Sequence, residues 1–131
     1  MHYIHLVAAL AVLQFFFFGI MVGRARARFG INAPATTGNE HFDRMFRVQM
    51  NTLEQLTGFL PALYIAGQFW PPSYVAAVGI VYLAGRFVFW RAYIADPTSR
   101  SLGFLLTISP TFLLLIAGVA GAVLRIASSA A

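Results

Sequence analysis

The sequence predicts an all-α membrane protein built as a bundle of four transmembrane helices. Of its 131 residues, 60% are hydrophobic and only 10% are charged, whereas a soluble domain carries about 25% charged residues. Four apolar segments are each long enough to cross a hydrocarbon core, which requires roughly 20 helical residues. The period-2 alternation of a transmembrane β-barrel is absent from the sequence.

We expect the four spans at about residues 5–23, 41–69, 73–95 and 102–124, within one domain that covers residues 1–131. Backbone groups in lipid must find their hydrogen bonds within the segment, so each span is expected to be a helix. The first segment has no basic region before it and is followed by "GRARARFG", which is no cleavage site. We therefore interpret it as a retained helix and not as a signal peptide.

The distribution of arginine predicts the orientation in the membrane. The segment 24–44 and the turn 91–100 hold most of the arginines outside the spans, whereas the turn "WPPS" holds none and only Arg125 opposes the bias. By the positive-inside rule, the first and third connections lie in the cytoplasm and both termini lie outside. For a bacterial protein this predicts the inner membrane, with any site at the arginine-rich end facing the cytoplasm.

A polar stripe runs into the second span. Arg47, Asn51 and Glu54 follow the spacing i, i+4, i+7, which places them on one face of a helix. Ionisable groups at membrane depth normally face the bundle interior or a wet cavity. Two interpretations stay open for Glu54: a structural pair with Arg86 of the third span, or contact with a ligand. For Arg47 and Asn51, nearer the mouth of the bundle, ligand contact is favoured.

The third span and the turn after it carry further candidates. Tyr93 lies on the same helical face as Arg86 and offers a hydroxyl donor, whereas Trp90 is better explained as part of an interfacial aromatic belt. The dipeptide Asp96-Pro97 ends this helix, and Arg100 opens the next region. Taken alone, Arg100 is better explained as an arginine that extends toward the lipid interface or faces a phosphate.

The remaining composition excludes several classes of function. All nine basic residues are arginine, and they lie at the edges of apolar runs, which argues against nucleic-acid binding. There is no cysteine, and the three histidines have no metal-ligand spacing, so no metal site is expected. What remains is an arginine-rich crevice in a helical bundle. It suits a small ligand with carboxylates, because arginine offers forked donors.

The stretch "FDRMFRVQMNTLEQL" resembles the helix-two signature R-x-x-R-x-x-x-N-x-x-E of the MAPEG family, the membrane-associated proteins of eicosanoid and glutathione metabolism. "PATTGNEHF", "LAGRFVFWRAY" and "PTSRSLG" are similar to other family motifs, and the resemblance covers about residues 25–120. Within the family, the likeness is strongest to the microsomal glutathione transferases and leukotriene-C synthase, in a short bacterial form.

This resemblance implies a homotrimer of four-helix subunits, with glutathione sites between neighbouring subunits. It implies a transferase that activates the glutathione thiolate for attack on a lipophilic electrophile. Arg100 would stabilise the thiolate, since a nearby cation lowers the pKa of a thiol. The residues implied to bind glutathione share positions with the family's contacts, and they are Arg26, Arg47, Gln49, Asn51, Glu54, Arg86 and Tyr93.

Three positions depart from the family pattern. Phe89 replaces a second tyrosine of helix three, Gln55 replaces the tyrosine after the signature glutamate, and Ala27 replaces one of two paired arginines. These departures affect the pose of glutathione and the choice of lipid substrate, but they leave Arg100 in place.

Other functions stay open at this point. A glutathione-dependent peroxidase activity on lipid hydroperoxides would use the same thiolate. A non-catalytic lipid-binding protein of the same fold would need no glutathione. A structural or transport bundle would bind neither, with its arginines serving only at the interface. Binding of glutathione therefore separates the transferase and the peroxidase from the lipid-binding protein and the structural or transport bundle.

Overall fold

The computed structural model describes residues 1–130, and in this range every regular element is helical. The elements are α1 (His2–Phe29), α2 (Glu40–Phe69), α3 (Pro72–Ala95), the short 3₁₀ helix η1 (Pro97–Ser99) and α4 (Ser101–Ala130). The all-α prediction is confirmed. The helices α1 and α4 extend beyond the expected spans 5–23 and 102–124, because each continues past the apolar run through polar residues.

Three segments are long and apolar enough to cross a membrane: His2–Phe29, Pro72–Ala95 and Pro97–Ala130. Four were predicted from the sequence, and α2 is the exception. It has 30 residues, or about 45 Å of helix, but its first half carries Arg44, Arg47 and Glu54. The charges lower its hydropathy without shortening it, so α2 differs from the other helices in composition and not in length.

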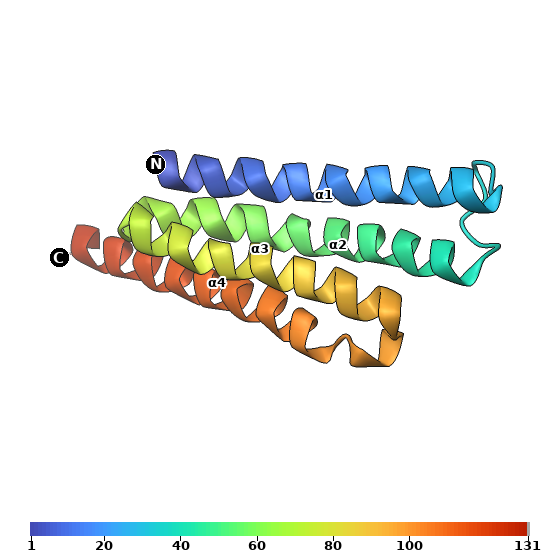
Figure 1. Ribbon diagram of the computed structural model, residues 1–131. Coiled ribbons are helices and arrows are strands. Elements are labelled where there is room, and N and C mark those ends of the chain that lie inside the picture. The colour runs from blue at the N-terminus through green and yellow to red at the C-terminus, as the bar shows by residue number, and fades with distance from the viewer. Residues whose placement is uncertain (131) are drawn as a thin grey trace.

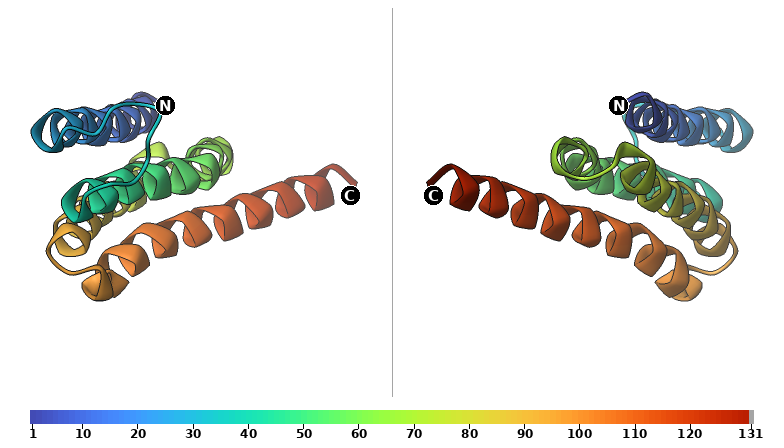
Figure 2. Two further views of the ribbon diagram at one scale, coloured as in Figure 1. Left: turned by 90° about the vertical axis from the view of Figure 1, so that its right-hand side faces the viewer. Right: turned by 90° about the vertical axis from the view of Figure 1, so that its left-hand side faces the viewer.

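The four long helices run side by side along one direction (Figure 1). The views in Figures 1 and 2 place α1 and α4 on opposite sides of the central α2–α3 pair. The start of α1 and the end of α4 lie at one end of the bundle, and both the α1–α2 loop and the α3–α4 turn lie at the other (Figure 1). We call this second end the loop end.

Local sequence signals end and begin these helices. Gly30, with φ of 67°, ends α1 in the left-handed conformation that glycine adopts without a penalty. The side chain of Asn39 accepts hydrogen bonds from the backbone N–H groups of His41 and Phe42, at 2.9 and 3.2 Å, and so caps α2. Pro72 begins α3 in the first helical turn, where its missing N–H is no loss.

Two apolar clusters form the core, one toward each end of the bundle. The cluster at the terminal end includes Phe59 and Tyr82, whose rings stack 3.8 Å apart, and the cluster at the loop end includes Phe18 and Phe42. Buried polar side chains also occur, namely Gln14, Thr52, Arg86, Thr107 and Thr111. The three threonines are satisfied by carbonyls one turn back in their own helices.

The approach of α3 to α4 depends on two glycines. A Cβ atom built on Gly103 would lie 2.4 Å from the backbone nitrogen of Phe89, and one built on Gly85 would lie 2.7 Å from the backbone of Leu106. No larger side chain fits at these positions without moving the helices apart. This contact holds the start of α4 against the end of α3, and the candidate site lies there.

Candidate functional site

A cavity of about 660 Å³ lies near the loop end between α2, α3 and α4. Its lining combines two arginines, three other polar residues and three apolar ones: Arg47, Asn51, Phe89, Tyr93, Arg100, Ser101, Phe104 and Leu105. The volume falls within the range of roughly 300–1,000 Å³ that is usual for small-molecule sites. A shallower hollow of about 440 Å³ adjoins the cavity, since Arg47 and Tyr93 line both.

Helical spacing explains how each element presents its residues. Arg47 and Asn51 are one turn apart on α2, and Phe89 and Tyr93 are one turn apart on α3. The rings of Phe89 and Tyr93 stack with centroids 5.4 Å apart, so the phenylalanine supports the tyrosine ring. The close contact at Gly103 brings α4 alongside both helices.

The cavity is positively charged. Its lining contains two guanidinium groups, those of Arg47 and Arg100, and no carboxylate. Neither arginine side chain nor the Tyr93 hydroxyl hydrogen-bonds to another residue among residues 1–130, and the only ion pair in this range joins Arg44 to Glu40. Forked donors without protein partners suit an anionic ligand that carries carboxylates.

The turn that precedes α4 fixes the position of Arg100. Asp96 accepts hydrogen bonds from the backbone N–H of Thr98, at 3.1 Å, and from its hydroxyl, at 2.9 Å. The Ser99 hydroxyl donates to the carbonyl oxygens of Ala92, at 3.0 Å, and Asp96, at 2.7 Å. The hydrogen bonds from Thr98 hold the pKa of the Asp96 carboxyl below its ordinary value. Asp96 therefore stays ionised at neutral pH and keeps the turn closed.

Arg86 lies beneath the cavity and does not line it. Its side chain is fully buried, and Nη1 donates to Oδ1 of Asn51 at 2.8 Å, while the guanidinium carbon sits 4.3 Å from the centre of the Phe89 ring. The structure does not form the ion pair between Arg86 and Glu54 that was one of the two predicted alternatives. Arg86 donates a hydrogen bond to Asn51 instead, and Glu54 is exposed. The other two nitrogens of the guanidinium have no hydrogen-bond partner among residues 1–130.

Three other predicted contacts lie away from this cavity. Arg26 donates to the carbonyl oxygen of Ala35 at 2.7 Å and lies over the Phe42 ring. Gln49 points at α1, where its amide nitrogen would be 2.7 Å from a Cβ built on Gly19. Glu54 is exposed about two turns from Arg47 along α2. Within one chain, then, four of the predicted residues gather, namely Arg47, Asn51, Tyr93 and Arg100.

Sequence reasoning did not identify the apolar wall of the cavity. Phe104 and Leu105 supply it from α4, beside Ser101. The spacing of Ser101 and Phe104 places them near Arg100 on one helical face, which was the available signal. Among residues 1–130 no group of histidine, cysteine or acidic side chains is arranged to hold a metal ion.

Comparison with known families matches residues 4–120 to the MAPEG family. The chain belongs to the MAPEG family. The resemblance found in the helix-two signature is thus confirmed over nearly the whole chain, and with it the assignment as an integral membrane protein. In this MAPEG chain, the signature residues Arg47 and Asn51 are those that line the cavity from α2.

Individual relatives agree with the family assignment. The MAPEG chain is 46% identical over 101 residues to an uncharacterised protein of Synechocystis sp., covering 77% of this chain and 74% of that protein. It is 33% identical to human microsomal glutathione S-transferase 2, covering 88% and 78% of the two chains. It is 35% identical to bovine leukotriene C4 synthase, covering 72% of this chain and 63% of the synthase.

Proposed function

We propose that this protein is a membrane-bound glutathione transferase that binds glutathione in the cavity between α2, α3 and α4. The observation that supports this most is that Arg47 and Arg100, whose side chains bond to none of residues 1–130, line one cavity with Asn51 and Tyr93. Glutathione has two carboxylates and a thiol, which match this donor set. Two relatives are named as a glutathione S-transferase and a leukotriene C4 synthase, which supports glutathione as the thiol substrate.

In this proposal Arg100 holds the sulfur as a thiolate. A cation beside a thiol favours the charged form and lowers the pKa from about 8.5 toward neutrality, which raises the thiolate fraction at pH 7 from about 3% toward half. Arginine does this without losing its own proton. The thiol proton passes to water, the sulfur forms a bond to an electrophilic carbon, and the group displaced there keeps the electron pair.

The same cavity wall provides a place for the electrophile. Phe104 and Leu105 are apolar, are both exposed on α4 and lie beside Arg100. A lipophilic substrate dissolved in the bilayer reaches such a wall without crossing water. Reduction of a lipid hydroperoxide to the alcohol, with oxidation of two glutathione molecules to the disulfide, is an additional activity that the same thiolate supports.

We further propose that the active assembly is a homotrimer with sites shared between neighbours. Arg47 and Gln49 are two residues apart on α2, which places them about 200° apart around the helix, so one small ligand cannot contact both within one chain. Arg26 and Gln49 of one subunit, with Glu54 on the exposed face of α2, would complete the site of the adjacent subunit. Light scattering of the detergent-solubilised protein tests the subunit count.

We propose that α2 is the fourth span and that the loop end faces the cytoplasm, in the inner membrane of a bacterium. Six of the nine arginines belong to the loop-end segments 24–44 and 91–100, and only Arg125 lies toward the other end. The cavity then opens to the compartment that contains glutathione.

The deciding experiment is an ultraviolet difference spectrum of the purified protein with glutathione at neutral pH, read at the thiolate absorbance. We expect a thiolate band in the parent protein and in Arg125→Ala, a control arginine at the opposite end, and none in Arg100→Ala. Isothermal titration establishes that glutathione is bound in each case. Bound glutathione without a thiolate band in the parent would overturn the transferase assignment and leave a glutathione-binding protein. Failure to bind glutathione would favour the lipid-binding alternative.

A further inference from the structure

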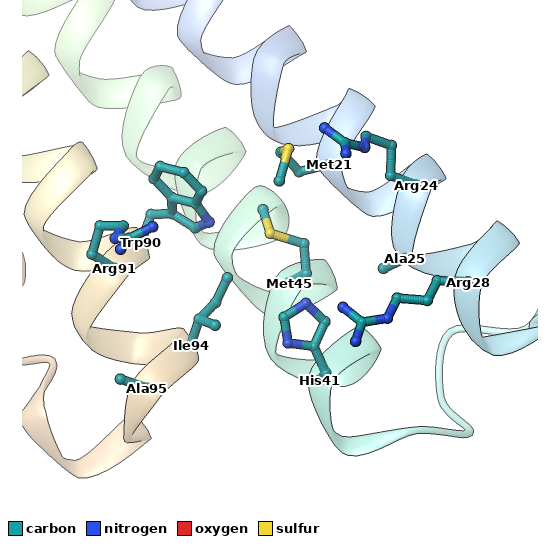
Figure 3. A pocket seen from close by; sticks show the side chains of 10 residues that line it. All are labelled: Met21, Arg24, Ala25, Arg28, His41, Met45, Trp90, Arg91, Ile94 and Ala95. Atoms are coloured by element: carbon teal, nitrogen blue, oxygen red, sulfur yellow. The ribbon is translucent and has the colours of Figure 1, made fainter.

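A second cavity of about 500 Å³ lies at the loop end on the other side of the bundle, between α1, α2 and α3 (Figure 3). Three of its lining residues are arginines: Arg24 and Arg28 one turn apart on α1, and Arg91 on α3. Its lining is completed by Met21, Ala25, His41, Met45, Trp90, Ile94 and Ala95, none of them acidic. We call it the α1–α3 hollow. It shares no lining residue with the proposed glutathione cavity.

The three arginines of the α1–α3 hollow are not neutralised within the chain. All three side chains are exposed, and none makes an ion pair or a side-chain hydrogen bond with any of residues 1–130. Arg91 rests on the ring of Trp90 at 5.5 Å, and Arg28 on the ring of Phe29 at 5.1 Å. Aromatic contacts of this kind steady the guanidinium groups but leave all their N–H donors free for an anion.

Trp90 forms part of the wall of the α1–α3 hollow, with its indole N–H enclosed. The indole N–H is buried and has no hydrogen-bond partner among residues 1–130. Figure 3 shows the indole nitrogen on the side of the ring that faces Met21 and Met45 across the hollow. Because this N–H is enclosed by its neighbours, the guanidinium groups around the hollow, and not the indole, are the donors that an anion would meet.

The side of the α1–α3 hollow that faces the membrane interior is apolar and aromatic. Phe17 packs edge-on against Trp90 at 5.5 Å and against Phe87 at 6.3 Å, and both phenylalanines are partly exposed. Ile20, 63% exposed, continues this surface along α1. An anion held by the arginines would therefore have an apolar surface directly below it, facing lipid. A free phosphate ion would leave that surface unused.

From these observations we propose that the α1–α3 hollow binds the headgroup of an anionic phospholipid. The polar headgroup, with its phosphate, accepts hydrogen bonds from the arginines placed around the hollow, Arg24, Arg28 and Arg91, and the acyl chains lie against the apolar surface formed by Phe17, Ile20 and Phe87. Basic pockets between membrane helices bind anionic headgroups in this way. Arg26 lies about 200° from Arg24 around α1 and is bonded to Ala35, so it is not part of this site.

Trp90 provides a direct readout, because the chain has only two tryptophans. In a Trp70→Phe protein, Trp90 is the sole indole, and bromine atoms on nearby lipid chains quench its fluorescence. The protein is reconstituted in phosphatidylcholine vesicles that contain a small fraction of brominated phosphatidylglycerol, and separately in vesicles where the same fraction of phosphatidylcholine is brominated. We expect brominated phosphatidylglycerol to quench Trp90 at least about 10-fold more effectively at equal mole fraction.

Replacement of the arginines identifies the site. Arg24→Gln, Arg28→Gln and Arg91→Gln should each lower the preference for phosphatidylglycerol about fivefold, and the triple variant should nearly abolish it. Arg125→Gln, which removes an exposed arginine at the opposite end, should leave the preference unchanged. Equal quenching by the two lipids, or a preference that survives the triple substitution, would overturn the proposal. So would loss of the preference on addition of millimolar inorganic phosphate, which would reassign the hollow to a soluble anion.

A second measurement does not depend on Trp70→Phe. Native mass spectrometry of the parent protein, purified from vesicles that contain both lipids, should retain phosphatidylglycerol in preference to phosphatidylcholine. The parent with Arg125→Gln should do the same, and the triple variant should retain neither selectively. Retention without a difference between the parent and the triple variant contradicts the assignment.

Discussion

Nη1 of Arg86 donates a hydrogen bond to Oδ1 of Asn51 at 2.8 Å, and this contact joins α3 to α2 directly beneath the proposed glutathione cavity. Arg86 has no exposed surface, whereas Asn51 is partly buried and lines the cavity. A ligand that contacts Asn51 therefore contacts a side-chain amide whose orientation is already fixed by a buried cation. The arginine acts on the site through this amide and through the Phe89 ring on which it rests.

The first prediction concerns this pair. Asn51→Ala should lower the free energy of unfolding by about 1.5–3 kcal/mol, because it removes the hydrogen bond to a buried charged group and leaves that group with no acceptor. The double variant Asn51→Ala/Arg86→Met should be more stable than Asn51→Ala alone, since the unpaired charge is gone. Unfolding in mixed detergent micelles, followed by circular dichroism, measures both. Additive effects of the two substitutions would show that the residues are not coupled.

The second prediction concerns the contact between α3 and α4. Gly103→Ala should destabilise the protein by about 1–3 kcal/mol, because its Cβ would lie 2.4 Å from the backbone of Phe89 and no flexible side chain can move aside. It should also weaken glutathione binding, since Tyr93 on α3 and Arg100 at the start of α4 line the proposed cavity beside this contact. Gly23→Ala is the matched control: its Cβ meets nothing within 4 Å, and alanine is the better helix former. Similar unfolding curves for the two variants would contradict this account.

Much of the fold was predictable from the sequence because membrane helices can be recognised as long apolar runs. Helical spacing predicted that Arg47 and Asn51 share one face of α2, and the family resemblance implied that Tyr93 and Arg100 belong to the same site; the structure places all four around one cavity. The partner of Arg86 was not predictable. Asn51 and Glu54 are about one turn apart on the same face, so only the packing of α2 against α3 decides which one the guanidinium meets.

The α1–α3 hollow could not be found in the sequence for a related reason. Arg24 and Arg28 are more than sixty positions from Arg91, and nothing in the local pattern indicates that α1 lies against α3. Trp90 fits the description of an interfacial aromatic residue whether or not such a hollow exists. The lengths of α1 and α4 were underestimated because a helix outside the hydrocarbon core needs no apolar residues to continue.

The third prediction concerns orientation. The chain has no cysteine, so a single introduced thiol is the only one to react. We expect Ala35→Cys, in the α1–α2 loop, to be protected from a membrane-impermeant maleimide in intact spheroplasts, and Ser128→Cys, near the end of α4, to be labelled. After lysis both should react. The opposite pattern would place the proposed glutathione cavity on the outer side and remove the cytoplasmic pool as its source of glutathione.

The last prediction concerns pH and the turn that positions Arg100. The pKa of Asp96 is lowered in the folded protein by the hydrogen bonds from Thr98. A carboxyl whose folded pKa lies below its unfolded value of 3.8 stabilises the fold at every pH above that value, and this contribution disappears as the pH falls through the folded pKa. Asp96→Asn should therefore be less stable than the parent at pH 7, and the difference between the two proteins should shrink as the pH is lowered below 3.8.

The comparison is made on the difference between the two unfolding curves at each pH, because every residue other than 96 is the same in both proteins. Glu40→Gln serves as the control: it removes the carboxylate that pairs with Arg44, whose guanidinium also donates to the carbonyl oxygens of Ile94 and Ala95, and it keeps both hydrogen bonds from Thr98 to Asp96. At neutral pH, Asp96→Asn should also weaken the thiolate band of bound glutathione, whereas Glu40→Gln should not, since only the first loosens the turn that holds Arg100. A stability difference that is the same at pH 3 and pH 7 would mean that the Asp96 side chain acts through its shape and not through its charge.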